Sequence, residues 1–311
     1  MEYLRLTDWR IAVALTIPCV YALACLGLRR FQTKLMFFPP EDVGATPADV
    51  GISYEDLRLK VGEGEVHGWW IPAPVASNQS SNQPSGQPSG QPSGQPSKRE
   101  PPVILYAHGN GSNLSDLVFR FQQFHDWGYA VMAIDYRGYG KSSGPFPNEQ
   151  RVYEDIEVAW QYLIRQQEIA ANKIVIYGQS IGGAIALDLA IDHPDAAGLV
   201  MESSFTSMRD MVDYKFPLLP KLTPIETILT QRFDSAQKMR SLKVPLLLIH
   251  GTDDDIVPIS MSQALYGEAI IAGNIASRLV LIEGGDHNSL PTFGGDSYAD
   301  NIRGFVDLQT R

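Results

Sequence analysis

The sequence predicts a doubly wound α/β fold, in which helices cover both faces of a mostly parallel sheet. Two observations support this fold class. Short, continuously apolar runs recur along the chain, and helical patterns with one apolar face lie between them. Continuous rather than alternating apolar runs are typical of strands that are buried on both faces of a parallel sheet. The predicted strands lie at 103–107, 130–134, 174–177, 199–201, 246–249 and 279–282.

The first predicted element is a membrane anchor. Residues 11–28 carry no charge, and as a helix they would span about 27 Å, close to the roughly 30 Å hydrocarbon core of a bilayer. We therefore expect residues 1–30 to form a retained, single-pass anchor, whose orientation stays open because basic residues flank both ends. Two alternatives remain. Ala22-Leu23-Ala24 resembles a signal-peptidase site, which would make the segment a cleaved signal or lipoprotein leader, and the segment could also be a buried core helix.

Residues 31–311 are expected to form one domain with a long insertion. Residues 51–72 predict antiparallel edge strands that precede the parallel part of the sheet. The stretch 77–98 repeats SGQP among Ser, Gln, Pro, Asn and Gly, and it has no apolar residues to bury, so we expect a disordered surface loop. Because strands are predicted on both sides of it, this loop does not separate two domains.

Helices are predicted between the strands. Apolar residues recur at helical spacing in 114–124 and again in 152–163. The interval 203–243 is too long for a simple crossover and is rich in Phe, Met, Leu and Pro, so we expect a small helical cap over the strand ends. The cap residues expected to form an apolar wall are Phe205, Met208, Met211, Phe216, Leu218 and Leu219.

Charge and cysteine content exclude several functions. The net charge of −10 argues against a nucleic-acid partner, which requires a basic face. Both cysteines, Cys19 and Cys25, lie in the predicted anchor, so the rest of the chain has no disulfide framework and no thiolate metal site. The chemistry considered below requires no metal or organic cofactor.

The central motif is GQSIGG at residues 178–183, between a predicted strand and a predicted helix. In this setting, G-x-S-x-G indicates a nucleophile turn, in which glycines permit close backbone packing and the serine begins a helix. Ser180 is therefore the predicted nucleophile. A serine hydroxyl needs a base, and the triad partners in such a fold follow in the order acid, then histidine.

Three histidines follow Ser180, and His287 fits the base best. His193 lies at a helix end and His250 ends a predicted strand, whereas His287 lies in GGDHN directly after the last predicted strand. The acid is expected after strand 246–249, where three aspartates stand side by side at 253–255, and spacing alone does not choose among them. Main-chain N–H groups of the loop 108–111, together with that of Ile181, are the expected oxyanion donors.

These motifs resemble those of the α/β-hydrolase superfamily, and in particular its membrane-anchored branch with prolyl-oligopeptidase-like and serine aminopeptidase-like signatures. The resemblance covers about residues 30–310 except the SGQP insertion. It implies Ser180, Asp254 and His287 as the catalytic triad. Asp254 is the implied acid because the family pattern D-x-x-V-P begins there. The resemblance also implies oxyanion amides at Asn110 and Ile181. The motifs that carry it are LMFFP, HGNGSN, DYRGYGKSSG, YGQSIGG, ESSFTSM, HGTDDDIVP and GGDHN.

The resemblance implies hydrolysis through an acyl-enzyme and leaves the acyl group open. We expect an ester or thioester hydrolase acting on apolar acyl groups of small molecules or lipidated partners, because the cap is apolar and the chain is predicted to be tethered to a membrane. The alternatives are a serine peptidase or aminopeptidase and a catalytically silent scaffold protein.

Overall fold

The computed structural model describes residues 8–40, 42–75 and 100–311, and the side chains of residues 8–15 are not described. The predicted SGQP loop at 77–98 lies outside the described residues. Strands β2 and β3, which precede and follow it, belong to the same sheet, as the sequence predicted.

Within the described residues, eight strands form one sheet in the order β1-β2-β4-β3-β5-β6-β7-β8. β1 pairs with β2 and β2 with β4 in antiparallel fashion, and the other neighbours are parallel. This confirms the predicted mostly parallel α/β sheet with antiparallel edge strands. The strands are β1 (Glu55–Val61), β2 (Gly64–Ile71), β3 (Val103–Ala107), β4 (Ala130–Ile134), β5 (Ile174–Gln179), β6 (Gly198–Glu202), β7 (Leu246–Gly251) and β8 (Arg278–Ile282).

Helices cover both faces of the sheet, because the central strands are apolar on both sides and both faces must be buried. All residues of β3, β4, β5, β6 and β7 are buried. One face packs against α3 (Glu149–Arg165), α4 (Ile181–Asp192), α8 (Ser235–Met239) and α9 (Ile259–Ile271), and the other against α2 (Val118–Asp126) and α10 (Leu290–Gln309). Short 3₁₀ helices occur at η1 (Pro47–Val50), η2 (Leu114–Leu117) and η3 (Ala171–Lys173).

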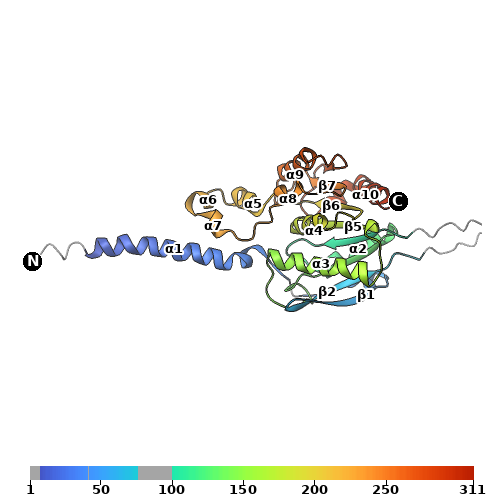
Figure 1. The fold of residues 1–311 in the computed structure, drawn as a ribbon, viewed down its shortest axis with the longest axis horizontal. Helices are drawn as coiled ribbons and strands as arrows, with labels where there is room; N and C mark the ends of the chain where they lie inside the picture. Colours follow the sequence, from blue (N-terminus) through green and yellow to red (C-terminus); the bar gives the residue numbers. More distant parts are fainter. Residues whose placement is uncertain (1–7, 41, 76–99) are drawn as a thin grey trace, which may run out of the picture.

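The cap is smaller than the predicted interval 203–243. It consists of α5 (Met208–Lys215), α6 (Leu219–Leu222) and α7 (Ile225–Ile228). The following helix α8 instead packs with α4 and α9 on the face of the sheet. Figure 1 shows the three cap helices beyond the ends of the strands, beside the C-terminal half of α1.

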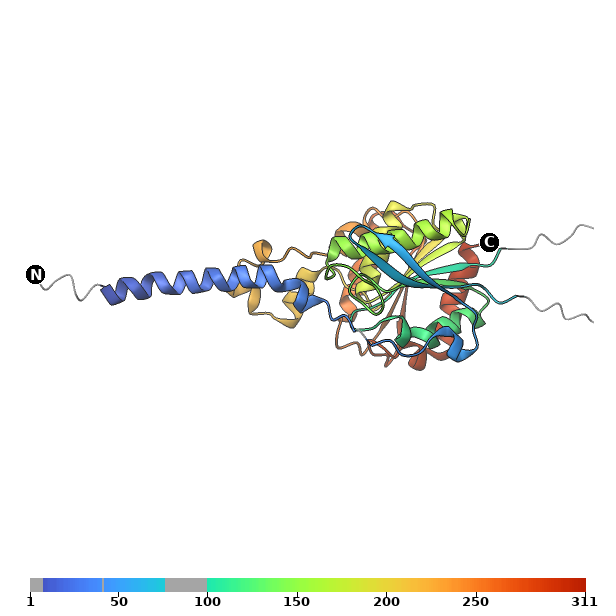
Figure 2. The same cartoon turned by 90° about the horizontal axis from the view of Figure 1, so that it is seen from below.

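Helix α1 (Asp8–Met36) projects from the body along the longest axis of the molecule (Figures 1 and 2). It continues eight residues past the apolar segment 11–28 and ends beside the cap. Among residues whose side chains are described, no helix combines the length and the apolar character that crossing a bilayer requires. Residues 11–15 of the predicted anchor are outside that set, so the anchor stays a prediction.

Candidate active site

Ser180 lies in a sharp turn between β5 and α4. Its backbone has φ 55° and ψ −122°, in the positive-φ region that residues other than glycine rarely adopt. The turn packs backbone against backbone, since a side chain at Gly178 would collide with the carbonyl of Gly182 and one at Gly182 with that of Ala107. The Ser180 N–H donates to the Glu202 carbonyl at 2.8 Å. The two glycines therefore permit the turn that holds Ser180 in place.

The structure brings Ser180, His287 and Asp254 together at the C-terminal ends of β5, β8 and β7. His287 Nε2 lies 3.0 Å from Ser180 Oγ, and His287 Nδ1 lies 2.8 Å from Asp254 Oδ2. The two loops that carry the acid and the base are joined where the Asp253 N–H donates to the Gly285 carbonyl at 3.0 Å. With its Nδ1 proton donated to the carboxylate, His287 keeps Nε2 free to accept the serine proton.

The structure distinguishes the three adjacent aspartates. Asp254 is buried, whereas Asp253 and Asp255 are exposed. Asp254 Oδ1 accepts the Val257 N–H at 2.8 Å, which leaves Oδ2 directed at His287. This arrangement agrees with the assignment of the acid that the family resemblance implied.

His250 contacts the same carboxylate, a role that the sequence analysis missed. Its Nε2 lies 3.2 Å from Asp254 Oδ2 and 2.9 Å from the Val257 carbonyl, and its Nδ1 lies 2.7 Å from Ser262 Oγ. Because Nε2 faces two oxygen acceptors, it carries the ring proton. Burial raises the pKa of Asp254, but hydrogen bonds from His250, His287 and the Val257 N–H outweigh burial and lower the pKa below its ordinary value. The only sequence signal was the place of His250 at a strand end, four residues before the acid.

The predicted oxyanion residues lie beside the nucleophile. A Cβ added to Gly109 would stand 3.5 Å from Ser180 Cβ, so the loop after β3 packs directly against the nucleophile turn. Asn110 and Ile181 both line the cavity that contains Ser180. Ile181 is also the first residue of α4, where main-chain N–H groups have no partner within the helix.

A segment that we call the strap, residues 36–40, holds this loop from the side of α1. The side-chain oxygen of Asn110 accepts the Phe38 N–H at 3.0 Å and the Tyr139 hydroxyl at 2.7 Å. The side-chain amide of Asn110 donates to the Met36 carbonyl at 2.5 Å. The side chain of Asn110 thus ties its own main-chain N–H to the end of α1. Sequence reasoning missed this contact, although LMFFP was noted as a family motif.

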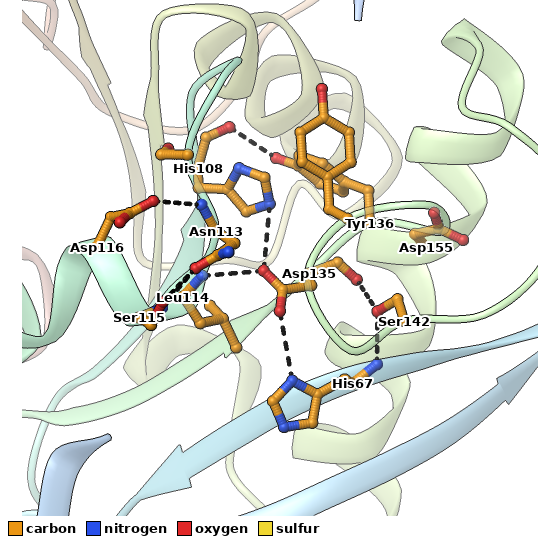
Figure 3. A network of polar contacts seen from close by, with 12 residues as sticks. His67, His108, Asn113, Leu114, Ser115, Asp116, Asp135, Tyr136, Ser142 and Asp155 are labelled. Atoms are coloured by element: carbon orange, nitrogen blue, oxygen red, sulfur yellow. Dashed lines mark hydrogen bonds and ion pairs between the residues drawn. The ribbon is translucent and has the colours of Figure 1, made fainter. Parts of the chain in front are cut away.

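Behind the loop, a buried polar network supports its base (Figure 3). Asp135 Oδ1 accepts the Leu114 N–H at 2.9 Å, and Asp135 Oδ2 lies 3.3 Å from His67 Nδ1. His108 Nδ1 donates to the Gly109 carbonyl at 2.7 Å, and burial lowers the pKa of His108, so its ring is neutral. His108 therefore braces the loop and is not placed to exchange protons with a substrate.

We predict that Asn110→Ala lowers kcat by about 10- to 100-fold with little change in KM, because it leaves the main-chain N–H but removes the three bonds that position it. The check is steady-state kinetics with a soluble ester. Asn148→Ala is the matched control, since it removes the cap of α3, at 2.9 Å from the Arg151 N–H, away from Ser180. An unchanged kcat in Asn110→Ala would show that the loop holds its geometry without the strap.

Ser180 and His287 border a cavity of about 500 Å³. Four of the six predicted wall residues line it, and they come from the cap and the segment before it: Phe205, Met208, Met211 and Phe216. The other two, Leu218 and Leu219, lie outside it. The sequence analysis did not assign the other apolar residues of the wall. They come from the end of α1 and the strap, from α5 and from the loop after β7: Leu35, Met36, Phe38, Val212, Ile256 and Val257.

The charges around the cavity are few. Among the described residues that line it, Lys215 is the only permanently charged one, and none is a carboxylate. In the described part of the chain, no group of three His, Cys, Asp or Glu side chains is arranged to hold a metal ion. The residues at the cavity therefore favour apolar groups of a substrate.

The chain is similar in sequence to known proteins. Residues 99–237 match the family model described as serine aminopeptidase, S33. An uncharacterized protein of Mycobacterium tuberculosis is 28% identical over 298 residues, which cover 94% of this chain and 95% of that protein. Protein bem46 of Schizosaccharomyces pombe is 33% identical over 208 residues, which cover 66% of this chain and 67% of bem46. The chain belongs to the α/β-hydrolase superfamily.

The fold of this α/β hydrolase is shared with solved structures. The esterase Pf2001 of Pyrococcus furiosus superimposes with a TM-score of 0.66 at 19% identity, over 88% of this chain and 99% of the esterase. The predicted mostly parallel α/β fold is thereby confirmed. The membrane-anchored branch within the superfamily stays a prediction.

Proposed function

We propose that this α/β hydrolase is a membrane-tethered serine hydrolase that cleaves ester or thioester bonds of apolar acyl substrates. The observation that carries the proposal is the chain of contacts from Asp254 through His287 to Ser180, at the edge of a cavity with a largely apolar wall. His287 takes the proton of Ser180 as the hydroxyl attacks the carbonyl carbon, and the Asn110 and Ile181 amides stabilise the oxyanion.

Collapse of the tetrahedral intermediate expels the alcohol or thiol, which receives its proton from His287. Water then attacks the acyl-enzyme with His287 as base, which releases the acid and restores Ser180. Asp254 stays ionised throughout, because its pKa is lowered, and it stabilises the imidazolium that forms in each step.

A peptidase is the second candidate, since the matched family model is described as a serine aminopeptidase. An aminopeptidase holds the free ammonium group of its substrate, and a carboxylate is the usual partner for such a cation. The described residues that line the cavity include no carboxylate, and their only permanent charge is the cation of Lys215. This charge pattern favours ester and thioester substrates over peptides with a free N-terminus.

We predict that kcat/KM rises about fourfold per methylene over the first few carbons of the acyl chain, because each buried methylene contributes about 0.8 kcal/mol. The check is a series of p-nitrophenyl esters from acetyl to octanoyl, with matching thioesters and aminoacyl amides, on the full chain in one fixed detergent.

Met211→Ala should weaken the dependence of kcat/KM on acyl chain length, because Met211 lines the cavity. Ile271→Ala is the control, because Ile271 is 80% exposed on α9 and lies outside the cavity. Amides cleaved in preference to esters, or a series with no dependence on chain length, would contradict the proposal.

A further inference from the structure

We propose that the tip of the cap lies inside the bilayer, so that the acyl cavity opens to lipid rather than to water. The inference rests on the proposed function and deepens it, because it concerns how a lipid-borne substrate reaches Ser180. Three observations carry it: where α6 touches α1, which apolar side chains are exposed there, and which charges surround them.

Helix α6 contacts α1 within the predicted anchor. The Tyr21 hydroxyl donates to the Leu222 carbonyl at 3.0 Å. Position 21 is seven residues inside the end of the apolar segment at residue 28, which is about 10 Å along a helix axis. If residues 11–28 lie in hydrocarbon, the cap tip lies at a similar depth. Amphipathic elements at membrane interfaces are buried to about this depth, 5–10 Å.

Further bonds join the cap to α1 nearer the body. Arg29 donates to the Thr227 carbonyl, and the Gln32 amide donates to the Ile228 carbonyl at 2.9 Å. Gln32 is buried, so α1 and α7 meet in a formed contact rather than a chance approach. The cap and α1 therefore enter the bilayer together or not at all.

The exposed apolar side chains here form a surface that we call the lipid patch: Leu35, Phe38, Phe216, Leu218 and Leu222, each between 60% and 66% exposed. Three of them, Leu35, Phe38 and Phe216, also line the cavity. The patch is therefore continuous with the cavity mouth. A cluster of large apolar side chains exposed at one site is typical of an interaction surface, and contact with lipid would remove it from water.

The charges beside the patch are mainly basic. Segments 27–40 and 214–225 contain five basic residues and no acidic one, although the chain carries a net charge of −10. The five are Arg29, Arg30, Lys34, Lys215 and Lys221, and all are exposed. The acidic residues that adjoin the second segment, Asp213 and Glu226, both form ion pairs with Arg209. Cations at this level attract anionic headgroups, and a long side chain such as that of Lys221 can reach the interface from a partly immersed helix. The occupant of the patch is therefore a bilayer that contains anionic lipid.

The first test measures depth and needs no hydrolysis. An environment-sensitive fluorophore is attached at Leu222→Cys in the full chain, with Cys19→Ser and Cys25→Ser removing the native thiols. The protein is reconstituted in phosphatidylcholine vesicles with or without phosphatidylglycerol, and quenching by lipids spin-labelled in their acyl chains is recorded. Ile275→Cys is the control, because Ile275 is 89% exposed and precedes β8, at the opposite end of the sheet from Ser180.

We expect several-fold stronger quenching at position 222 than at 275, increased by phosphatidylglycerol. Equal quenching at the two positions would overturn the proposal. A second outcome would also overturn the proposal. If the fluorescence at position 222 changed with protein concentration in the absence of vesicles, the patch would be assigned to contact with a second copy of the chain.

The second test measures delivery of substrate. The double variant Leu218→Ser with Leu222→Ser should lower kcat/KM at least about tenfold for a long-chain ester carried in vesicles. It should leave kcat/KM for a water-soluble acetyl ester unchanged, since neither residue lines the cavity. The control variant, Ile271→Ser with Ile275→Ser, removes similar apolar surface elsewhere and should change kcat/KM for neither ester. A parallel loss with both esters would count against lipid contact. Failure of the proposed function would instead appear as a wild-type kcat/KM that does not depend on acyl chain length. The quenching measurement would still test the depth of the cap, because it does not depend on hydrolysis.

Discussion

Replacement of Ser180 by alanine is expected to lower hydrolysis on the order of 10⁶-fold, to the level that binding and oxyanion stabilisation alone provide. The reason is that His287 Nε2, 3.0 Å from Ser180 Oγ, would have no hydroxyl to deprotonate and no acyl-enzyme could form. Labelling by a fluorophosphonate probe should disappear in parallel, and this is measured by gel fluorescence and by single-turnover kinetics.

Ser203→Ala is the matched control for this loss. Ser203 is buried and follows β6 close to the site, and like Ser180 it has a positive φ, here 51°. In the described part of the chain its hydroxyl has no hydrogen-bond partner. Its removal should leave labelling intact. Undiminished labelling of Ser180→Ala would instead exclude Ser180 as the nucleophile.

Asp254→Asn is expected to lower kcat by about 10⁴-fold with the fold intact. An amide at this position presents an N–H to His287 Nδ1, which favours the tautomer whose Nε2 carries a proton and therefore cannot accept that of Ser180. Steady-state kinetics and the melting temperature are measured together, because the Asp254 carboxylate also contacts His250 and accepts the Val257 N–H, and these contacts contribute to the stability of the fold.

The neighbouring aspartates supply the controls for Asp254. Asp253→Asn and Asp255→Asn should stay within a few-fold of the wild type, because both side chains are exposed and neither contacts His287. If Asp253→Asn rather than Asp254→Asn caused the large loss of kcat, Asp253 would be the catalytic acid and the assignment would be wrong by one position. Equal, mild effects at all three positions would remove the carboxylate from the mechanism.

Much of the fold and of the candidate site was predictable because its signals are local. Apolar runs such as 103–107 and 246–249 reveal strands buried on both faces, and the glycines at 178 and 182 reveal a turn in which only glycine avoids collision. Spacing alone left three candidates for the acid. The family resemblance chose Asp254, and the structure shows that it is the one buried beside His287.

Contacts between segments far apart in the sequence could not be predicted in this way. The bond from Phe38 to Asn110 joins residues 72 positions apart, and that from Tyr21 to Leu222 joins residues 201 positions apart. The role of His250 likewise depends on the side chains that face it after folding.

By itself, the sequence determined the α/β sheet, the nucleophile turn at Ser180 and the place of His287, because periodicity and turn geometry act over a few residues. Only the tertiary structure decided which aspartate is buried, that the strap holds the Asn110 loop, and that Leu218 faces outward while Phe216 lines the cavity. Those features depend on which surfaces meet when the chain closes on itself, and an amphipathic segment does not specify its partner.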